Sequence, residues 1–311
     1  MKKAGLILII CSLVAAFTIY AGAATEVTLN IITAPEVPEY SIQDMINRIS
    51  SIRAYQFNVA YLQYSKEKYP EITVLPAYFF SKELVNEPQS FSVLAGSRMI
   101  TENWKAFKCL TYQIPPNTYE CGVYINNKTE KGKMDLFYRP FCPYGMKALI
   151  ALLEYHQKEP RIISELNIVP LLKETDTGFT SNKDSLHQRY QMPGGFMELR
   201  ETIRQLVIHE YMPDKLLEYI KYRQKNSIES PYWEKAVLKV GIKPETVSEL
   251  YETRGETLLD RAMEARSKYQ NISASPTYLW KNKYRYNYTS ELLQQPAFKD
   301  IKIEIGNSKC R

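Results

Sequence analysis

The sequence predicts an α/β fold in two domains, and three features of the chain point to it. Its 311 residues exceed the roughly 100–200 residues of a common single domain. Short apolar strand patterns alternate with helical patterns in both halves of the chain. The stretch 126–133 between the halves, Asn-Asn-Lys-Thr-Glu-Lys-Gly-Lys, is polar and charged, as linkers are. We therefore expect one domain over residues 26–127 and a second over residues 134–305.

The N-terminal segment, residues 1–23, has the pattern of a secretory signal peptide. Two lysines precede an apolar stretch over residues 4–24, and Ala21-Gly22-Ala23 forms a small-x-small cleavage site. An uncleaved membrane anchor is the alternative, because the stretch is nearly long enough to span a bilayer. The mature chain is thus expected to be periplasmic or secreted, and bound to a membrane only if this segment is retained.

Composition argues against several classes of function. The formal charge of +6 falls to +4 when the two lysines of the N-terminal segment are removed, which is too small and dispersed for a nucleic-acid partner. The three histidines, His156, His187 and His209, have no metal-ligand spacing, and no glycine-rich phosphate loop follows a strand pattern. We expect no metal and no cofactor.

The first domain has a strand–helix–strand pattern. Residues 27–32 alternate and include β-branched side chains, which indicates a strand. Residues 41–68 are predicted to be helical, with an N-cap at Ser41 and an apolar stripe through Ile42, Met45 and Ile49. A second strand is expected over residues 72–80.

The second domain opens with the stretch around which its chemistry is organised. A strand pattern, residues 134–138, precedes Phe141-Cys142-Pro143-Tyr144-Gly145, and a helical pattern follows from Met146 to His156. A cysteine at a helix start faces free backbone N–H groups and the positive end of the helix dipole, which favour the reactive thiolate. Pro143 suits the first turn because its missing N–H is not needed there.

The rest of the second domain continues the α/β pattern. A strand is predicted over residues 165–172 and a loop over residues 175–195. A block of helices interrupted by prolines covers about residues 183–268 and overlaps the end of that loop. Two short strands, 278–280 and 284–286, and a short helix starting near Ser290 complete the domain.

These motifs resemble the thioredoxin superfamily in its DsbA-like form. Cys142-Pro143-Tyr144 is similar to the active-site turn, and Ser275-Pro276-Thr277 is similar to the cis-proline loop that follows a helical insertion. The resemblance implies that Cys142 is the reactive thiol. It also implies that Ser275 and Pro276 contact the substrate backbone, with Phe141 and Tyr144 on an apolar rim.

The first domain resembles a degenerate copy of the same fold. Leu75-Pro76-Ala77 is similar to a second cis-proline loop, but the motif position, residues 34–38, reads Ala-Pro-Glu-Val-Pro and has no cysteine. The resemblance implies a scaffold or a partner-binding surface. A generic α/β domain with a trans Leu75–Pro76 bond is the alternative.

The second domain departs from the family pattern at Gly145, where a second cysteine is usual. Two hypotheses follow. The chain is an exported single-cysteine thiol-disulfide oxidoreductase or isomerase, whose Cys142 exchanges with the thiols or disulfides of exported proteins. Alternatively, it is a catalytically inactive tandem thioredoxin-fold protein that binds other proteins.

Three further cysteines remain after removal of the signal peptide, in a compartment where disulfides persist. Cys109 and Cys121 lie in strand-like runs on either side of Pro115, so a hairpin there would place them opposite each other. We expect a structural disulfide between them. The alternative is that one of them resolves a mixed disulfide at Cys142. Cys310, one residue from the end, has no assigned role.

Overall fold

The computed structural model of the protein describes residues 25–50, 55–80, 98–100, 111–113, 121–174, 189–269 and 272–301. The proposed signal peptide and its cleavage site lie outside these ranges. The chain divides into two compact units, Met1–Thr118 and Tyr119–Arg311. In the part of the chain that the model describes, no helix has the length and apolar character needed to cross a membrane.

Unit 1 is built on a strand–helix–strand crossover. Its first two strands run parallel in register, with Val27 opposite Phe57, and a third runs antiparallel to the first. The sheet order is β2-β1-β4-β6-β5. The elements are β1 (Thr25–Thr33), α2 (Glu39–Ser50), β2 (Tyr55–Gln63), β3 (Val74–Leu75), β4 (Ala77–Phe80), β5 (Arg98–Ile100) and β6 (Thr111–Gln113).

The predicted helix over residues 41–68 is wrong beyond Ser50. The helix α2 ends at Ser50, and residues 55–63 form β2. Gln56-Phe57-Asn58-Val59 alternates polar and apolar side chains, which is a strand pattern. In β2, Gln56 and Asn58 are exposed whereas Phe57 and Val59 are partly covered. Pairing with β1 therefore outweighs the helical pattern that precedes it.

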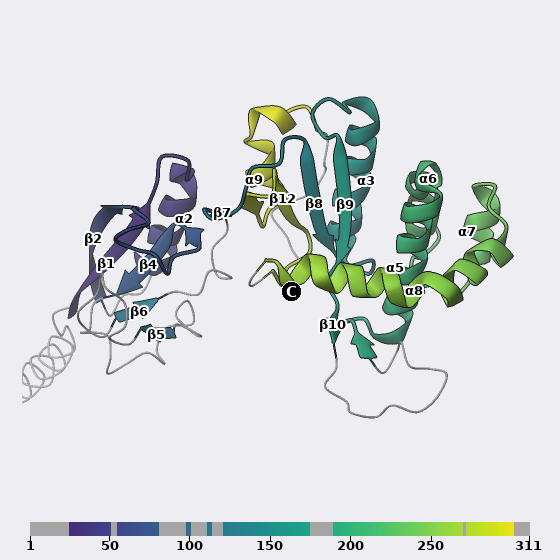
Figure 1. The fold of residues 1–311 in the computed structure, drawn as a ribbon, viewed down its shortest axis with the longest axis horizontal. Coiled ribbons are helices and arrows are strands. Elements are labelled where there is room, and N and C mark those ends of the chain that lie inside the picture. The colour runs from purple at the N-terminus through teal and green to yellow at the C-terminus, as the bar shows by residue number, and fades with distance from the viewer. Residues whose placement is uncertain are drawn as a thin grey trace, which may run out of the picture. The chain divides into compact units, whose positions relative to one another are not determined.

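Unit 2 contains the motif Cys142-Pro143-Tyr144. Figure 1 labels most of the strands and helices of this unit. Its elements are β7 (Cys121–Tyr124), β8 (Lys133–Tyr138), α3 (Pro143–Lys158), β9 (Glu165–Pro170), β10 (Lys173–Glu174), β11 (Tyr190–Gln191), α5 (Gly195–Tyr211), α6 (Pro213–Lys225), α7 (Glu234–Lys239), α8 (Pro244–Ser267), β12 (Thr277–Trp280), β13 (Tyr284–Tyr286), α9 (Thr289–Leu293) and the 3₁₀ helix η4 (Pro296–Phe298).

The central strands of unit 2 repeat the arrangement of unit 1. Strands β8 and β9 are parallel and joined by α3, β12 is antiparallel to β8, and β13 is antiparallel to β12. The order β9-β8-β12-β13 thus matches β2-β1-β4-β6 in unit 1, strand for strand and sense for sense. In both units a cis-proline immediately precedes the antiparallel strand: Pro76 before β4 and Pro276 before β12.

The boundary between the units differs from the predicted linker. Residues 126–133 belong to unit 2, where the Asn127 side chain donates to the carbonyl of Asn282 at 2.8 Å. The Glu130 amide donates to the carbonyl of Lys281 at 3.0 Å. The segment is therefore polar because it packs against the turn between β12 and β13, where polar groups find backbone partners.

The predicted hairpin centred on Pro115 is wrong. Strand β6, on its N-terminal side, pairs with β4 and β5, whereas β7, on its C-terminal side, pairs with β13 in the other unit's sheet. Cys109 lies outside the described residues. The Cys109–Cys121 disulfide thus stays a prediction, but the strand pairing that motivated it is absent.

The helical insertion predicted over residues 183–268 is present as α5, α6, α7 and α8, and a buried polar cluster holds part of it together. The Glu201 carboxylate, 1% exposed, accepts from the Tyr219 hydroxyl at 3.1 Å and pairs with Arg223 at 3.1 Å. Gln205 links this cluster to the sheet, because its amide oxygen accepts from the Tyr138 hydroxyl at 2.9 Å. Helix α5 is thereby tied to the last residue of β8.

Candidate active site at Cys142

Cys142 is the N-cap of α3, as the sequence predicts. Its backbone is extended (φ −86°, ψ 114°), and Pro143 begins the helix. The Gly145 amide donates to the Cys142 sulfur at 3.4 Å. The helix continues because the side chains of Met146, Leu149 and others at helical spacing are buried against the sheet. The sulfur thus sits where helix-end N–H groups point.

The loop before β12 meets this helix end. The Ser275–Pro276 bond is cis, and the Ser275 carbonyl oxygen lies 3.4 Å from the Cys142 sulfur. Strand pairing explains the contact, because β12 lies beside β8 with Thr277 opposite Phe137. Residues that precede Thr277 therefore lie beside residues that follow β8.

The state of the sulfur differs from the free, accessible thiol that the motif suggests. Cys142 is fully buried, with 0% of its surface exposed. Its sulfur is bonded in a disulfide whose partner lies outside the described side chains. A disulfide sulfur has no hydrogen to donate, so its approach to the Ser275 carbonyl is a van der Waals contact.

Gly145 occupies a position with no room for a side chain. A Cβ built there would lie 2.2 Å from Oγ of Ser275, a separation that real Cβ atoms do not show. The same hydroxyl accepts from the Arg139 amide at 3.0 Å, so it cannot turn away without leaving that N–H unpaired. The other nearest atoms, Arg139 O and N, lie at 3.3 and 3.4 Å. The Ser275 hydroxyl thus occupies the space that a side chain at residue 145, the fourth position of the cysteine motif, would need.

A buried carboxylate that the sequence analysis missed holds the other side of the turn. Glu198, 0% exposed, accepts from the Phe141 amide at 2.9 Å and from the Gly194 amide at 2.7 Å. It also pairs with the Arg139 guanidinium at 3.4 Å. An acidic residue in the first turn of a helix is ordinary in sequence, so nothing there connected Glu198 to residues 139–141.

The remaining predicted residues are placed as follows. Phe141 and Tyr144 are partly exposed on either side of Cys142, so both can contact a bound chain. In unit 1 the Leu75–Pro76 bond is cis, and residues 34–38 form the turn between β1 and α2. No cysteine occurs among the described residues of unit 1.

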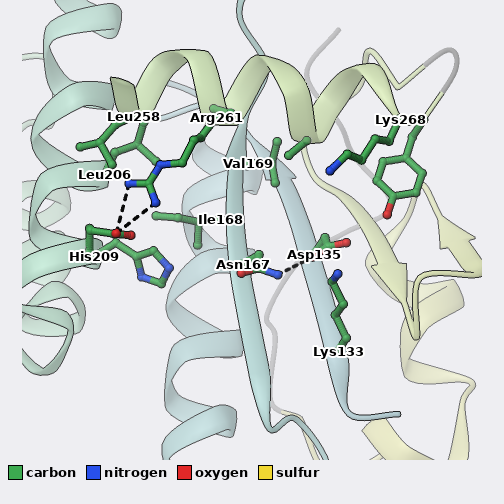
Figure 2. Close-up of a pocket in the computed structure, with 14 residues that line it drawn as sticks. Lys133, Asp135, Asn167, Ile168, Val169, Leu206, His209, Leu258, Arg261 and Lys268 are labelled. Carbon is green, nitrogen blue, oxygen red and sulfur yellow. Dashed lines mark hydrogen bonds and ion pairs between the residues drawn. The ribbon is translucent and has the colours of Figure 1, made fainter. Parts of the chain in front are cut away.

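Unit 2 also contains a cavity of about 220 Å³ between β8, β9, α5 and α8 (Figure 2). Asn167 donates to the buried Asp135 carboxylate at 2.8 Å, and Arg261 of α8 holds Glu210 through two bonds of 3.1 Å. Burial raises the pKa of Asp135 above its ordinary value, although Asn167 and Lys133 oppose the shift. Burial likewise lowers the pKa of His209. No residue of 139–145 or 273–276 lines this cavity.

The described ranges can also be compared with the ligand sets that metal ions need. There, no group of three or more His, Cys, Asp or Glu side chains is placed to hold a metal ion.

Comparisons with known proteins give only distant likeness. No protein-family model matches the chain, and no curated protein is detectably similar in sequence. A candidate protein disulfide isomerase of Nitrosomonas europaea is similar in structure, with 15% identity and a TM-score of 0.36 over 53% of this chain and 95% of its own. The DsbA disulfide interchange protein of Klebsiella pneumoniae shares 14% identity, with a TM-score of 0.34 over 54% and 81%.

Both scores are below 0.5, so the fold is assigned from the strand order and the turn instead. A parallel β–α–β unit, an antiparallel strand preceded by a cis-proline, a cysteine at the helix start and an inserted helical block occur together in unit 2. The protein is a mixed α/β protein, and unit 2 has the strand order, the cis-proline loop and the inserted helices that the resemblance to the thioredoxin superfamily implies.

Replacing Glu198 by glutamine tests whether its buried carboxylate stabilises the turn before Cys142. The amide can accept from only one of the two backbone N–H groups and removes the buried negative charge that pairs with Arg139, so we expect the free energy of unfolding to fall by about 3 kcal/mol. Urea denaturation measures it. The matched control is Glu210→Gln on the same helix, whose exposed pair with Arg261 should contribute less than about 1 kcal/mol. Equal losses of unfolding free energy in the two variants would contradict a stabilising role for the buried Glu198 carboxylate.

Replacing Asp135 by asparagine tests the effect of this buried carboxylate, which lines the 220 Å³ cavity, on the pH dependence of stability. Because its folded-state pKa is raised, the wild-type protein loses stability as pH rises from the unfolded-state value, about 3.9, through the folded-state value. We expect Asp135→Asn to be more stable, relative to wild type, at pH 7 than at pH 4. The exposed Glu249→Gln serves as the control. Urea denaturation at both pH values checks this, and a gain that is larger at pH 4 would contradict it.

Proposed function

We propose that this protein is an exported thiol-disulfide oxidoreductase or isomerase whose exchanging sulfur is Cys142. The observation that carries the proposal is the position of that sulfur, which is at the N-cap of α3 and 3.4 Å from the carbonyl beside a cis-proline. Export follows from the signal-peptide pattern of residues 1–23. The substrates are protein thiols or disulfides of the same compartment.

The chemistry starts from the disulfide that Cys142 holds. A substrate thiolate attacks the Cys142 sulfur, the existing S–S bond breaks, and the partner cysteine leaves as a thiolate. A second substrate thiolate then attacks the substrate sulfur of the mixed disulfide, and Cys142 leaves as a thiolate. Two electrons and two protons pass from the substrate dithiol to the protein, whose two cysteines end as thiols.

Each step uses groups present in the turn. The Gly145 amide and the positive end of α3 face the departing Cys142 thiolate and stabilise its charge. The cis-proline loop offers its backbone to an extended substrate chain, flanked by Phe141 and Tyr144. Since Gly145 leaves no room for a resolving thiol in the turn, the second cysteine of the cycle is the disulfide partner of Cys142, which comes from elsewhere in the chain.

A second function has its own supporting observation. Cys142 is fully buried and already bonded, as a structural disulfide sulfur would be. In that case the two units form a catalytically inactive tandem protein that binds other exported proteins, with unit 1 as a degenerate thioredoxin-like domain.

Replacing Cys142 by serine separates the two functions. If Cys142 exchanges, the variant loses the reaction with a cysteine-containing peptide, followed by mass spectrometry of the mixed disulfide, by at least about tenfold. If the disulfide is only structural, the rate is unchanged and the free energy of unfolding falls by about 2–5 kcal/mol. The wild-type adduct must map to Cys142, because the other cysteines supply background that the serine variant measures.

A double-mutant cycle at Gly145 and Ser275 tests why the turn has one cysteine. We expect Gly145→Cys to lower the free energy of unfolding by about 1–3 kcal/mol, because its Cβ overlaps the Ser275 hydroxyl. In the Ser275→Ala background the same change should cost less, by about 1 kcal/mol or more. Urea denaturation of the four proteins gives the coupling. Additive effects would show that the hydroxyl does not close the position.

A further inference from the structure

A cavity of about 310 Å³ adjoins both loops of the proposed active site. Arg139 lines it from the turn before Cys142, and Ser273 lines it from the loop before Pro276. Met192 and Pro193 form an apolar side, and Lys173 and Arg266 complete the polar side. The cavity is thus lined in part by residues of both loops that meet at Cys142.

The cavity carries positive charge that the described part of the protein does not neutralise. The Arg139 guanidinium is balanced by Glu198 at 3.4 Å. Arg266 instead donates to the backbone carbonyls of Leu172 and Ile272, and no described carboxylate lies within ion-pair distance of it or of the exposed Lys173. Among the described residues, Lys173 and Arg266 thus give this cavity two positive charges without a carboxylate partner.

Hydrogen bonds to two backbone carbonyls fix the position of the Arg266 guanidinium. Its two carbonyl partners belong to the residues after β9 and to the loop before Pro276, so the guanidinium bridges the two segments. A guanidinium has five N–H donors, so two such bonds leave others for a ligand. Partial burial lowers the pKa of the Arg266 guanidinium from its ordinary value.

We propose that this cavity binds the carboxylate side chain of an aspartate or glutamate close to the reacting cysteine of a polypeptide substrate. The inference rests on the proposed exchange at Cys142 and gives its substrate class: acidic segments. Lys173 and Arg266 would hold the carboxylate, and Met192 and Pro193 would pack on its methylene groups.

The test uses peptides whose single cysteine is activated as a mixed disulfide with thionitrobenzoate. The full chain is first reduced; its Cys142 thiolate attacks the peptide sulfur, the S–S bond to thionitrobenzoate breaks, and the coloured thiolate leaves. We expect a peptide with glutamates beside the cysteine to react about fivefold faster than one with glutamines, the size expected of a partly exposed ion pair. The rate of Cys142→Ser is subtracted.

Two charge-reversal variants sharpen the result. Lys173→Glu should abolish the preference or invert it, whereas Lys239→Glu, an exposed lysine of α7 away from the cavity, should preserve it. The preference should also shrink at high ionic strength. Equal rates for both peptides in the wild-type protein, or equal effects of the two variants, would overturn the proposal while leaving exchange at Cys142 intact.

A cysteine-free acidic peptide keeps the proposal testable if Cys142 does not exchange at all. Its binding to the oxidised full chain, measured by fluorescence anisotropy, should be several-fold weaker with Lys173→Glu than with Lys239→Glu. Binding that both variants weaken equally would overturn the acidic-segment site independently of the exchange reaction.

Discussion

The antiparallel pairing of β12 with β8 is the constraint on which the candidate site depends. It places Thr277 opposite Phe137, so the residues before one and after the other are forced together. Ser275 consequently meets Cys142 through its carbonyl and Gly145 through its hydroxyl. The helical insertion separates Cys142 from Ser275 by 133 residues in the chain, but the register of β8 and β12 brings the sulfur within 3.4 Å of the Ser275 carbonyl oxygen.

The backbone N–H groups of the turn before Cys142 all have hydrogen-bond partners. Arg139 donates its amide to the Ser275 hydroxyl, Phe141 to Glu198, and Cys142 to the Arg139 carbonyl at 3.1 Å. The prolines at positions 140 and 143 have no N–H to satisfy. Buried backbone groups without partners are costly, so Ser275 and Glu198 hold the turn from opposite sides. The sulfur is thereby oriented by groups that never react.

The two units share one strand order, but only unit 2 has a described cysteine at the crossover helix. In unit 1 the corresponding turn is Ala34-Pro35-Glu36-Val37-Pro38, and the cis bond at Pro76 is retained. A cis-proline beside the first strand is therefore a feature of this strand arrangement in both units. The cysteine is the element that gives unit 2 its proposed chemistry.

The sequence by itself determined the local elements: the cysteine at a helix start, the β–α–β order of unit 2 and the helical insertion. These follow from short-range patterns, namely periodicity, Pro143 at the first helical turn and the prolines between helices. It failed at β2, where residues 55–63 follow a helical pattern without a break, and at the hairpin around Pro115, where pairing partners lie far away in the chain. The tertiary structure alone revealed the groups around the turn: Glu198 against residues 139–141, the Ser275 hydroxyl against Gly145, and the charged cavity with Arg266. Those contacts join segments far apart in the chain, from 57 residues for Glu198 and Phe141 to 136 residues for Arg139 and Ser275. Sequence spacing carries no information about which distant side chains a sheet register brings together.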